Sequence, residues 1–330
     1  MKKNNRSLLV ITFFNRKETL IPQCKFLEKY DEDIDIIFVD QSETTWDTPI
    51  ECAKIKDVHH LPASKYHFYE MWKYICELYK EHSFIYWNND DDFASPTGIK
   101  KAEQFLLANP EYSVAQGQVI QLATLKDINW DYATGEWFKQ DMSHESILDR
   151  IENTFKNLYV NPHILTRMEI WTTAINLVCE TLNSNSSLGP IKFWDKIFTL
   201  VAICGGYRKT NLNCLSLIRL HRNISGSLMV DHLVYAHDQR PQHVDPQVPK
   251  ILESGTSYEE IFNRLEICNP IANNLNSQQN IDLKKAHKTI IEALNIKNMK
   301  AFEINEELQK ETPLFNHMQE FNNVVNILNE

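Results

Sequence analysis

Three consecutive acids, Asp90, Asp91 and Asp92, stand two asparagines after an apolar run over residues 84–87. Like charges packed this closely repel one another, so a fold does not place them at a strand end for stability. A divalent cation removes the repulsion, because carboxylate oxygens suit hard ions such as Mg²⁺ and Mn²⁺. Such an ion can in turn hold a diphosphate. The alternative is a solvated acidic turn, since most runs of charge lie in solvent.

Apolar runs of strand length alternate with helical patterns in the first 125 residues. The expected strands cover residues 7–14, 34–39, 58–61, 84–87 and 114–122, and the expected helices cover 19–30, 69–79 and 96–108. The last helix has Ser95 as its expected N-cap and Pro96 at its first position. This alternation predicts an α/β fold with an open, mostly parallel, Rossmann-like sheet flanked by helices.

Polar residues gather at three carboxyl ends of these strands. Asn15 and Arg16 follow the first strand, Asp40 follows the second, and the acidic triplet follows the fourth. Ligands of open α/β sheets bind beyond the carboxyl ends of the strands. The convergence of three strand ends, more than the triplet alone, therefore predicts a binding site.

The composition narrows the classes of partner. The net charge is −10 and no block is rich in Lys or Arg, so no nucleic-acid partner is expected. Only 8 glycines are present and no GxxxxGK[ST] loop occurs, which favours a metal-held over a glycine-cradled phosphate. The 7 scattered cysteines form no CxxC pair and predict reduced thiols of a cytoplasmic protein. No apolar run reaches about 18 residues, so no transmembrane helix is expected, and peripheral contact with the inner face of the membrane stays open.

The chain changes character at about residue 228. A proline-rich connector over residues 241–249 precedes three amphipathic helical patterns, the last of which opens at Thr312 and has coiled-coil spacing. We therefore expect two parts, a domain over residues 1–227 and an all-helical extension over residues 228–330. The extension either packs on the domain or makes a homodimer.

Three segments together resemble the family 2-type glycosyltransferases of the GT-A fold. They are the run from Thr12 to Arg16, the run from Phe38 to Ser42, and the run from Tyr86 to Phe93 with its DxD pattern. The resemblance covers roughly residues 7–225 and implies a GT-A fold for the first domain. One departure is Thr12, which stands where the family commonly has proline.

The resemblance implies a donor site for a nucleoside-diphosphate sugar. The backbone from Thr12 through Phe13 to Asn15, together with Asp40, would line the base and ribose. Asp90 would lie near the ribose, with Asp91 between it and the metal-binding Asp92. The basic residues Arg16 and Lys65 are candidates for the phosphates or for orienting the aspartates. A Mn²⁺ or Mg²⁺ ion on Asp92 and Asp90 would bridge the diphosphate. Lys65 as a surface lysine and Asp40 as an ordinary turn residue are the alternatives.

Two later residues complete the expected site. Asp195 stands at the start of a helix expected over residues 191–204 and is the candidate base of an inverting transfer. It could equally cap that helix. His221 follows an expected strand over residues 215–220 and is a candidate third metal ligand, with a structural histidine as the alternative. The aromatic segment 130–137 reads as a turn, either on the acceptor side or packed on the surface.

These observations predict a metal-dependent glycosyltransferase (hexosyltransferase type). It would move a sugar from a nucleoside-diphosphate sugar to a hydroxyl of a glycan, polysaccharide or glycolipid acceptor. The favoured donor is a UDP-sugar. One alternative is a sugar-phosphate nucleotidyltransferase, although residues 12–17 lack the glycines of its phosphate loop. Another is a non-catalytic sugar-nucleotide-binding or scaffold protein of a glycan assembly complex.

Overall fold

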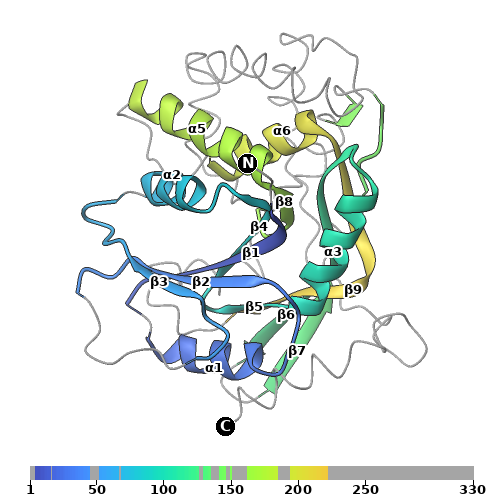
Figure 1. Ribbon diagram of the computed structural model, residues 1–330. Coiled ribbons are helices and arrows are strands. Elements are labelled where there is room, and N and C mark those ends of the chain that lie inside the picture. Colours follow the sequence, from blue (N-terminus) through green and yellow to red (C-terminus); the bar gives the residue numbers. More distant parts are fainter. Residues whose placement is uncertain are drawn as a thin grey trace.

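The computed structural model (Figure 1) describes residues 4–15, 17–44, 52–66, 68–125, 129–134, 141–145, 149–150, 162–184 and 194–221. Arg16 and the expected helical extension over residues 228–330 lie outside the described residues. Among the described helices, none has both the length and the apolar character needed to cross a membrane.

One sheet runs through the described part of the chain, in the order β3-β2-β1-β4-β8-β6-β9-β5, with β7 paired to β6. Its first block is parallel throughout: β3 (Asp57–His60), β2 (Asp35–Asp40), β1 (Asn4–Phe13) and β4 (His82–Asn89). This block confirms the α/β class and the Rossmann-like sheet.

The second block of the sheet is mixed. β6 (Tyr112–Leu125) runs parallel to β9 (Tyr207–His221), whereas β8 (Leu165–Arg167) is antiparallel to both β4 and β6. β5 (Asp92–Ala94) is antiparallel to β9 and closes the order. The two blocks meet where β8 joins β4 to β6.

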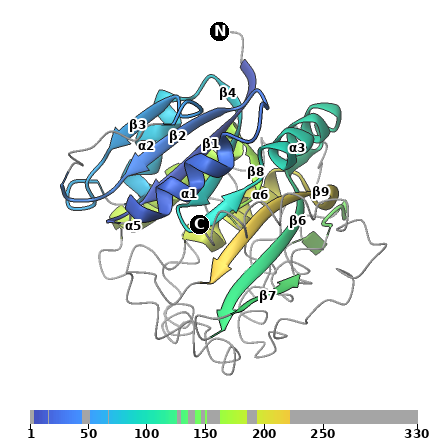
Figure 2. The same ribbon diagram turned by 90° about the horizontal axis from the view of Figure 1, so that it is seen from below.

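Helices cover both faces of the sheet (Figures 1 and 2). α1 (Lys17–Leu27) and α3 (Pro96–Ala108) lie on one face, and α2 (Phe68–Leu78), α5 (Met168–Ser184) and α6 (Trp194–Gly205) form the layer on the other. In β1, Leu9 and Ile11 belong to the core under α1 and α3, so the equally buried Leu8 and Val10 face the α2 layer. Burial on both faces explains the continuous apolar run in the sequence.

A chain of aromatic rings holds the α2 layer together. Trp72 of α2 has its ring centroid 5.9 Å from that of Trp87 of β4 and 4.8 Å from that of Trp171 of α5. Phe198 of α6 lies 4.7 Å from Trp171 on the far side. Each such edge-to-face pair stabilises the packing by about 0.5–1.5 kcal/mol beyond area burial.

α3 begins as the sequence predicts and lies very close to β9. The Ser95 hydroxyl accepts a hydrogen bond from the Gly98 N–H at 3.0 Å, and Pro96 takes the first turn. A Cβ atom on Gly98 would stand 2.0 Å from the Leu215 carbonyl oxygen, so only glycine fits there. This close approach lets β9 run beside the β5 strand that precedes α3.

Two expectations from the sequence need correction. Residues 129–134 form strand β7 rather than a turn, because their backbone pairs with β6 from Thr124↔Trp130 to Ile120↔Thr134. The apolar pattern of the sequence also predicts a strand over residues 159–166, but the strand of the structure begins only at Leu165. A helix predicted over residues 146–155 falls mostly outside the described residues. The helix expected over residues 191–204 is confirmed as α6.

Candidate functional site

The carboxyl ends of β1, β2 and β4 are tied to one another by hydrogen bonds. The Asp90 N–H donates to the Thr12 carbonyl at 3.1 Å, and the Gln41 N–H donates to the Phe13 carbonyl at 3.0 Å. The Asn15 N–H donates to the Ser42 hydroxyl at 2.9 Å. The three polar clusters of the sequence therefore meet at one edge of the sheet.

The end of β1 has an unusual backbone and an exposed ring. Asn15 has a φ of 54°, the left-handed conformation that asparagine tolerates better than most residues. The preceding Phe14 exposes 47 % of its surface, whereas Phe13 exposes 3 %. The Phe14 side chain was given no role from the sequence, although an aromatic residue at the end of an expected strand was a signal. Its ring offers a stacking face at the ligand edge.

Asp40 closes the turn after β2. Its Oδ1 atom accepts a hydrogen bond from the Ser42 N–H at 2.8 Å, which is the contact of a turn aspartate. The Ser42 carbonyl lies 2.8 Å from His60 Nε2, and the Leu61 N–H donates to the Asp40 carbonyl at 2.7 Å. The turn is thereby fixed against the end of β3, with the Asp40 side chain buried beside it.

The acidic triplet is a buried turn, not a solvated one. Asp90 exposes 1 % of its surface and Asp92 exposes 2 %, while Asp91 is half-buried. The Thr19 hydroxyl donates to Asp90 Oδ2 at 2.8 Å. The turn is held by an element that lies about 70 positions earlier in the chain, as Thr19 belongs to the first turn of α1.

Two side-chain amides hold the backbone of this turn. Gln23 Nε2 donates to the carbonyls of Asp90, at 3.2 Å, and of Asp92, and Asn88 Nδ2 donates to the same Asp92 carbonyl at 2.7 Å. Neither amide was singled out from the sequence. A buried carbonyl needs such a donor, so Gln23 and Asn88 fix where the three carboxylates stand.

The backbone register brings the end of β9 to the acidic turn. Asp92 pairs with Arg219, Phe93 with Ile218 and Ala94 with Leu217 in antiparallel order. β9 ends at His221, two residues beyond the Arg219 that pairs with Asp92. The side chain of His221 lies outside the described part, and within that part no three His, Cys, Asp or Glu side chains form a metal-binding group. Two carboxylates and one imidazole are a donor set that fits Mn²⁺ or Mg²⁺.

Thr12 has a structural role at the end of β1. Its hydroxyl accepts a hydrogen bond from the Trp87 indole N–H at 2.9 Å. Trp87 in turn stacks on His163, with ring centroids 4.4 Å apart, and its carbonyl lies 3.1 Å from His163 Nδ1. The side chains of Thr12, Trp87 and His163 thus contact one another in series at the end of β1. His163 was not identified from the sequence.

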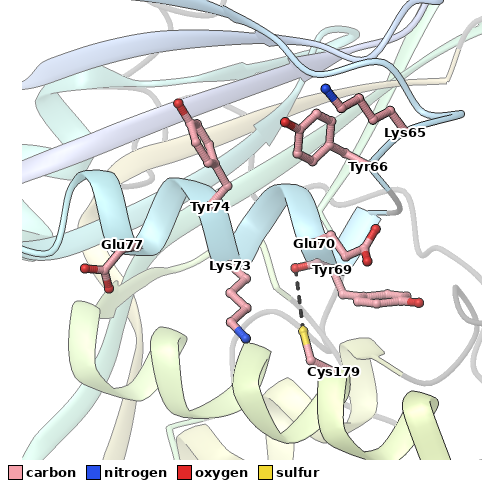
Figure 3. A pocket seen from close by; sticks show the side chains of 8 residues that line it. All are labelled: Lys65, Tyr66, Tyr69, Glu70, Lys73, Tyr74, Glu77 and Cys179. Carbon is pink, nitrogen blue, oxygen red and sulfur yellow. Dashed lines mark hydrogen bonds between the residues drawn. The ribbon is translucent and has the colours of Figure 1, made fainter.

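Two further residues that the sequence predicts for the site are Lys65 and Asp195. Lys65 is exposed, and its Nζ atom lies 5.4 Å from the centroid of the Tyr66 ring, beside an open groove of about 460 Å³ along α2 (Figure 3). Asp195 is the second residue of α6, in the first turn, where the helix N-terminus favours a negative charge. The structure describes its backbone but not its side chain.

Comparison with known proteins yields structural likeness alone. No family model and no curated protein sequence matches the chain. The crystal structure of S. aureus TarS is similar at 12% identity and a TM-score of 0.43, over 86% of this chain and 55% of that one. The structure of S. aureus TarS 1-349 is similar at 12% identity and a TM-score of 0.42, over 91% and 94%. The chain thus spans about half of the first TarS chain, and at these TM-scores neither likeness assigns a function.

Proposed function

We propose that this protein is a metal-dependent glycosyltransferase. It would move a sugar from a nucleoside-diphosphate sugar to a hydroxyl of a glycan or glycolipid acceptor, and a UDP-sugar is the favoured donor. One observation carries the proposal. A buried acidic turn lies at the same edge as the ends of β1 and β2, and the register of β9 brings His221 toward it. Charges gathered at the ligand edge of an α/β sheet are suited to a metal-held diphosphate.

The nucleoside would lie along the ends of β1 and β2. Phe14 would stack on the base, while Asn15, Asp40 and the backbone from Thr12 to Phe13 would line the base and ribose. Asp90 and Asp91 would stand next to the ribose. The turns that carry these residues are fixed by the contacts of Ser42 and Thr19, so the protein would bind without first ordering them.

Asp92, Asp90 and His221 would hold the Mn²⁺ or Mg²⁺ ion. When bound, the metal offsets the charge that develops on the departing nucleoside diphosphate. Arg16 and Lys65 would add positive charge beside the phosphates. Gln23 and Asn88 would keep the acidic turn in place while the ion binds.

Asp195 would act as the base of an inverting transfer. A carboxylate at this step takes the proton from the acceptor hydroxyl as the hydroxyl attacks the sugar. A position in the first turn of α6 stabilises the ionised form, since the helix N-terminus favours negative charge. We place the enzyme in the cytoplasm, because the cysteines in the described residues are free thiols.

The test is thermal stability of the purified chain with UDP, GDP, CDP and their sugars, each with and without Mn²⁺, followed by turnover assays. We expect a shift that needs both the metal and one nucleoside diphosphate and that is lost in Asp92→Ala. Asp33→Ala is the matched control, because Asp33 is an exposed acid at the opposite edge of the sheet. The absence of a thermal shift with every combination of metal and nucleotide would contradict the proposal. A shift without turnover of any donor would favour the non-catalytic sugar-nucleotide-binding protein.

A further inference from the structure

Tyrosines line the open groove along the outer face of α2 (Figure 3). Tyr66 and Tyr74 lie on one side of the helix, and Tyr69 lies on the other side, above α5. The groove volume of about 460 Å³ falls within the range of small-molecule sites, about 300–1,000 Å³. The core is filled by other residues of the helix, namely Met71, Trp72, Ile75 and Cys76. The tyrosines are therefore additional to the packing that holds α2 on the sheet.

The tyrosine rings are held in place by their neighbours. The ring centroids of Tyr66 and Tyr74 are 6.4 Å apart, and the His59 ring of β3 lies 6.2 Å from Tyr74, edge to face. The Cys179 thiol of α5 donates to the Tyr69 carbonyl at 3.8 Å. Tyr74 nonetheless exposes 42 % of its surface. Rings that are fixed and open to solvent can receive a ligand at little cost in conformational entropy.

Four charged side chains complete the lining and balance one another. They are Lys65, Glu70, Lys73 and Glu77, all exposed. Because two ammonium groups face two carboxylates, the groove does not suit a polyanion such as a nucleic acid. The ammonium groups donate hydrogen bonds, the carboxylates accept them, and a phenol does both. A neutral ligand with many hydroxyls matches this set of donors and acceptors.

The lining also distinguishes a carbohydrate from a protein partner. Among the described residues, no Leu, Ile, Val, Met or Phe side chain lines the groove. A docked peptide helix or strand places apolar anchors in pockets of such residues. A sugar ring instead has an apolar face for a tyrosine ring and hydroxyls for the polar groups around it, and tyrosine offers both kinds of contact.

One end of the groove lies at the carboxyl edge of the sheet. Lys65 belongs to the loop after β3, where the Ala63 N–H donates to the Gln41 carbonyl at 3.0 Å, next to the turn of Asp40. From this loop the groove follows α2 as far as Glu77. A chain of sugars bound along the helix would therefore have one end beside the proposed donor site.

We propose that the groove binds a neutral oligosaccharide chain and that this chain is the acceptor of the transfer. The acceptor role rests on the proposed function, whereas binding in the groove does not. The aromatic rings would hold the chain away from its reacting end, so that end alone would enter the transferase site.

The experiment measures binding to the full chain without nucleotide or metal, by calorimetric titration with maltohexaose, cellohexaose and chitohexaose. We expect at least one hexasaccharide to bind. Tyr74→Ala should weaken that binding about 10-fold, because a stacking face is lost, and Tyr74→Phe should retain most of it. Leu78→Ala is the matched control, because Leu78 is an exposed residue of the same helix outside the lining.

Two results would overturn the proposal. One is the absence of binding by all three hexasaccharides, and the other is unchanged affinity in both Tyr74→Ala and Tyr69→Ala. Hexasaccharide binding without a thermal shift for any nucleotide would support the groove and contradict the transferase. A nucleotide shift without hexasaccharide binding would do the reverse. Where both sites bind, Tyr74→Ala should raise the KM for the hexasaccharide acceptor and leave the Kd for the nucleotide unchanged.

Discussion

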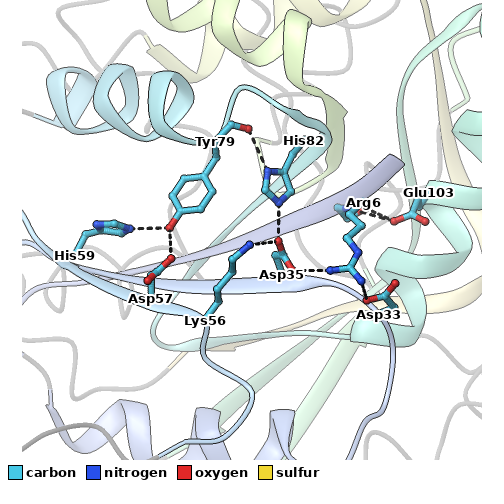
Figure 4. Close-up of polar contacts among 10 residues, drawn as sticks. Arg6, Asp33, Asp35, Lys56, Asp57, His59, Tyr79, His82 and Glu103 are labelled. Atoms are coloured by element: carbon cyan, nitrogen blue, oxygen red, sulfur yellow. Dashed lines mark hydrogen bonds and ion pairs between the residues drawn. The ribbon is translucent and has the colours of Figure 1, made fainter. Parts of the chain in front are cut away.

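The two edges of the parallel block treat their charged groups in opposite ways. At the amino edge, Asp35 meets Lys56 at 2.5 Å, His82 at 2.8 Å and Arg6 at 3.5 Å (Figure 4). At the carboxyl edge, the hydrogen bonds described for Asp40 and Asp90 come from neutral donors, a backbone N–H and a hydroxyl. The fold thus pairs opposite charges at the amino edge and gathers carboxylates at the carboxyl edge, where we propose that a ligand binds.

Contacts at the amino edge link the strands to α2. His82, at the start of β4, reaches Asp35 with Nε2 and lies 3.2 Å from the Tyr79 carbonyl with Nδ1. The Tyr79 hydroxyl donates to Asp57 at 2.8 Å and lies 2.8 Å from His59 Nε2. These contacts join the starts of β2, β3 and β4 to the helix end, which is a structural role.

Asp90→Asn at the carboxyl edge should show the largest difference between its effect on ligand affinity and its effect on stability. Affinity for Mn²⁺ with a nucleoside diphosphate should fall about 100-fold or more, because a ligand charge is lost. The free energy of unfolding should stay level or rise slightly, since an amide oxygen still accepts from Thr19 and repulsion among the acids falls. Calorimetric titration and urea unfolding measure the two effects, with the exposed Asp31→Asn as control. A stability loss above about 2 kcal/mol would instead make Asp90 a structural residue.

The mirror-image change is Asp35→Asn at the amino edge. We expect the free energy of unfolding to fall by about 2 kcal/mol, because the buried His82 and the half-exposed Lys56 and Arg6 lose their anion. Nucleotide affinity should not change. Asp33→Asn is the matched control and should cost less than about 1 kcal/mol, since this Arg6 partner is 65% exposed. Equal costs for the two variants would refute the distinction between a buried network and a surface pair.

Acid should weaken the amino edge in a defined direction. Burial raises the pKa of Asp35, but hydrogen bonds and charge from Lys56 and His82 outweigh it, so the pKa lies below its ordinary 3.8. The stabilisation from Asp35 is therefore complete above the unfolded-state pKa and is lost as the pH falls through the folded-state value. Urea unfolding from pH 6 to pH 3 should show the gap between the unaltered chain and Asp35→Asn narrowing in acid. A gap that is constant or widens would contradict the shift.

The smallest expected effect concerns backbone conformation at the carboxyl edge. Asn15→Ala should lower the free energy of unfolding by about 1 kcal/mol, because alanine disfavours a φ of 54°. Asn15→Gly should be nearly neutral at this position, since glycine has no Cβ to clash. Thermal or urea unfolding of the pair measures the difference. If both variants lose the same stability, the Asn15 side chain rather than its backbone is what matters.

Much of the parallel block could be predicted from the sequence. β1, β2 and β4 are buried on both faces, so each is a nearly continuous apolar run that ends at a polar cluster. The meeting of those clusters then follows from the parallel order, without any knowledge of side-chain contacts. The helix α3 was equally readable, because Ser95 and Pro96 mark its start.

The elements of the second block could be predicted less well from the sequence, because they depend on pairing with distant strands. β5 has three residues and exists through its pairing with β9, and β7 exists through its pairing with β6. α5 was missed although Ile170, Trp171, Ala174 and Ile175 are buried at helical spacing. Gln23 donates to the carbonyls of Asp90 and Asp92, which lie 67 and 69 positions later in the chain. No local sequence pattern indicates such a contact.

The ring chain from Trp87 through Trp72 to Trp171 also has an optical consequence. Indoles this close couple their electronic transitions, so the α2 layer should give an exciton signal in near-ultraviolet circular dichroism that vanishes in Trp72→Phe. Trp87 additionally donates its N–H to Thr12, at the end of β1. Its emission should therefore respond if a ligand binds at that strand end, which gives the protein a built-in fluorophore at the carboxyl edge of its sheet.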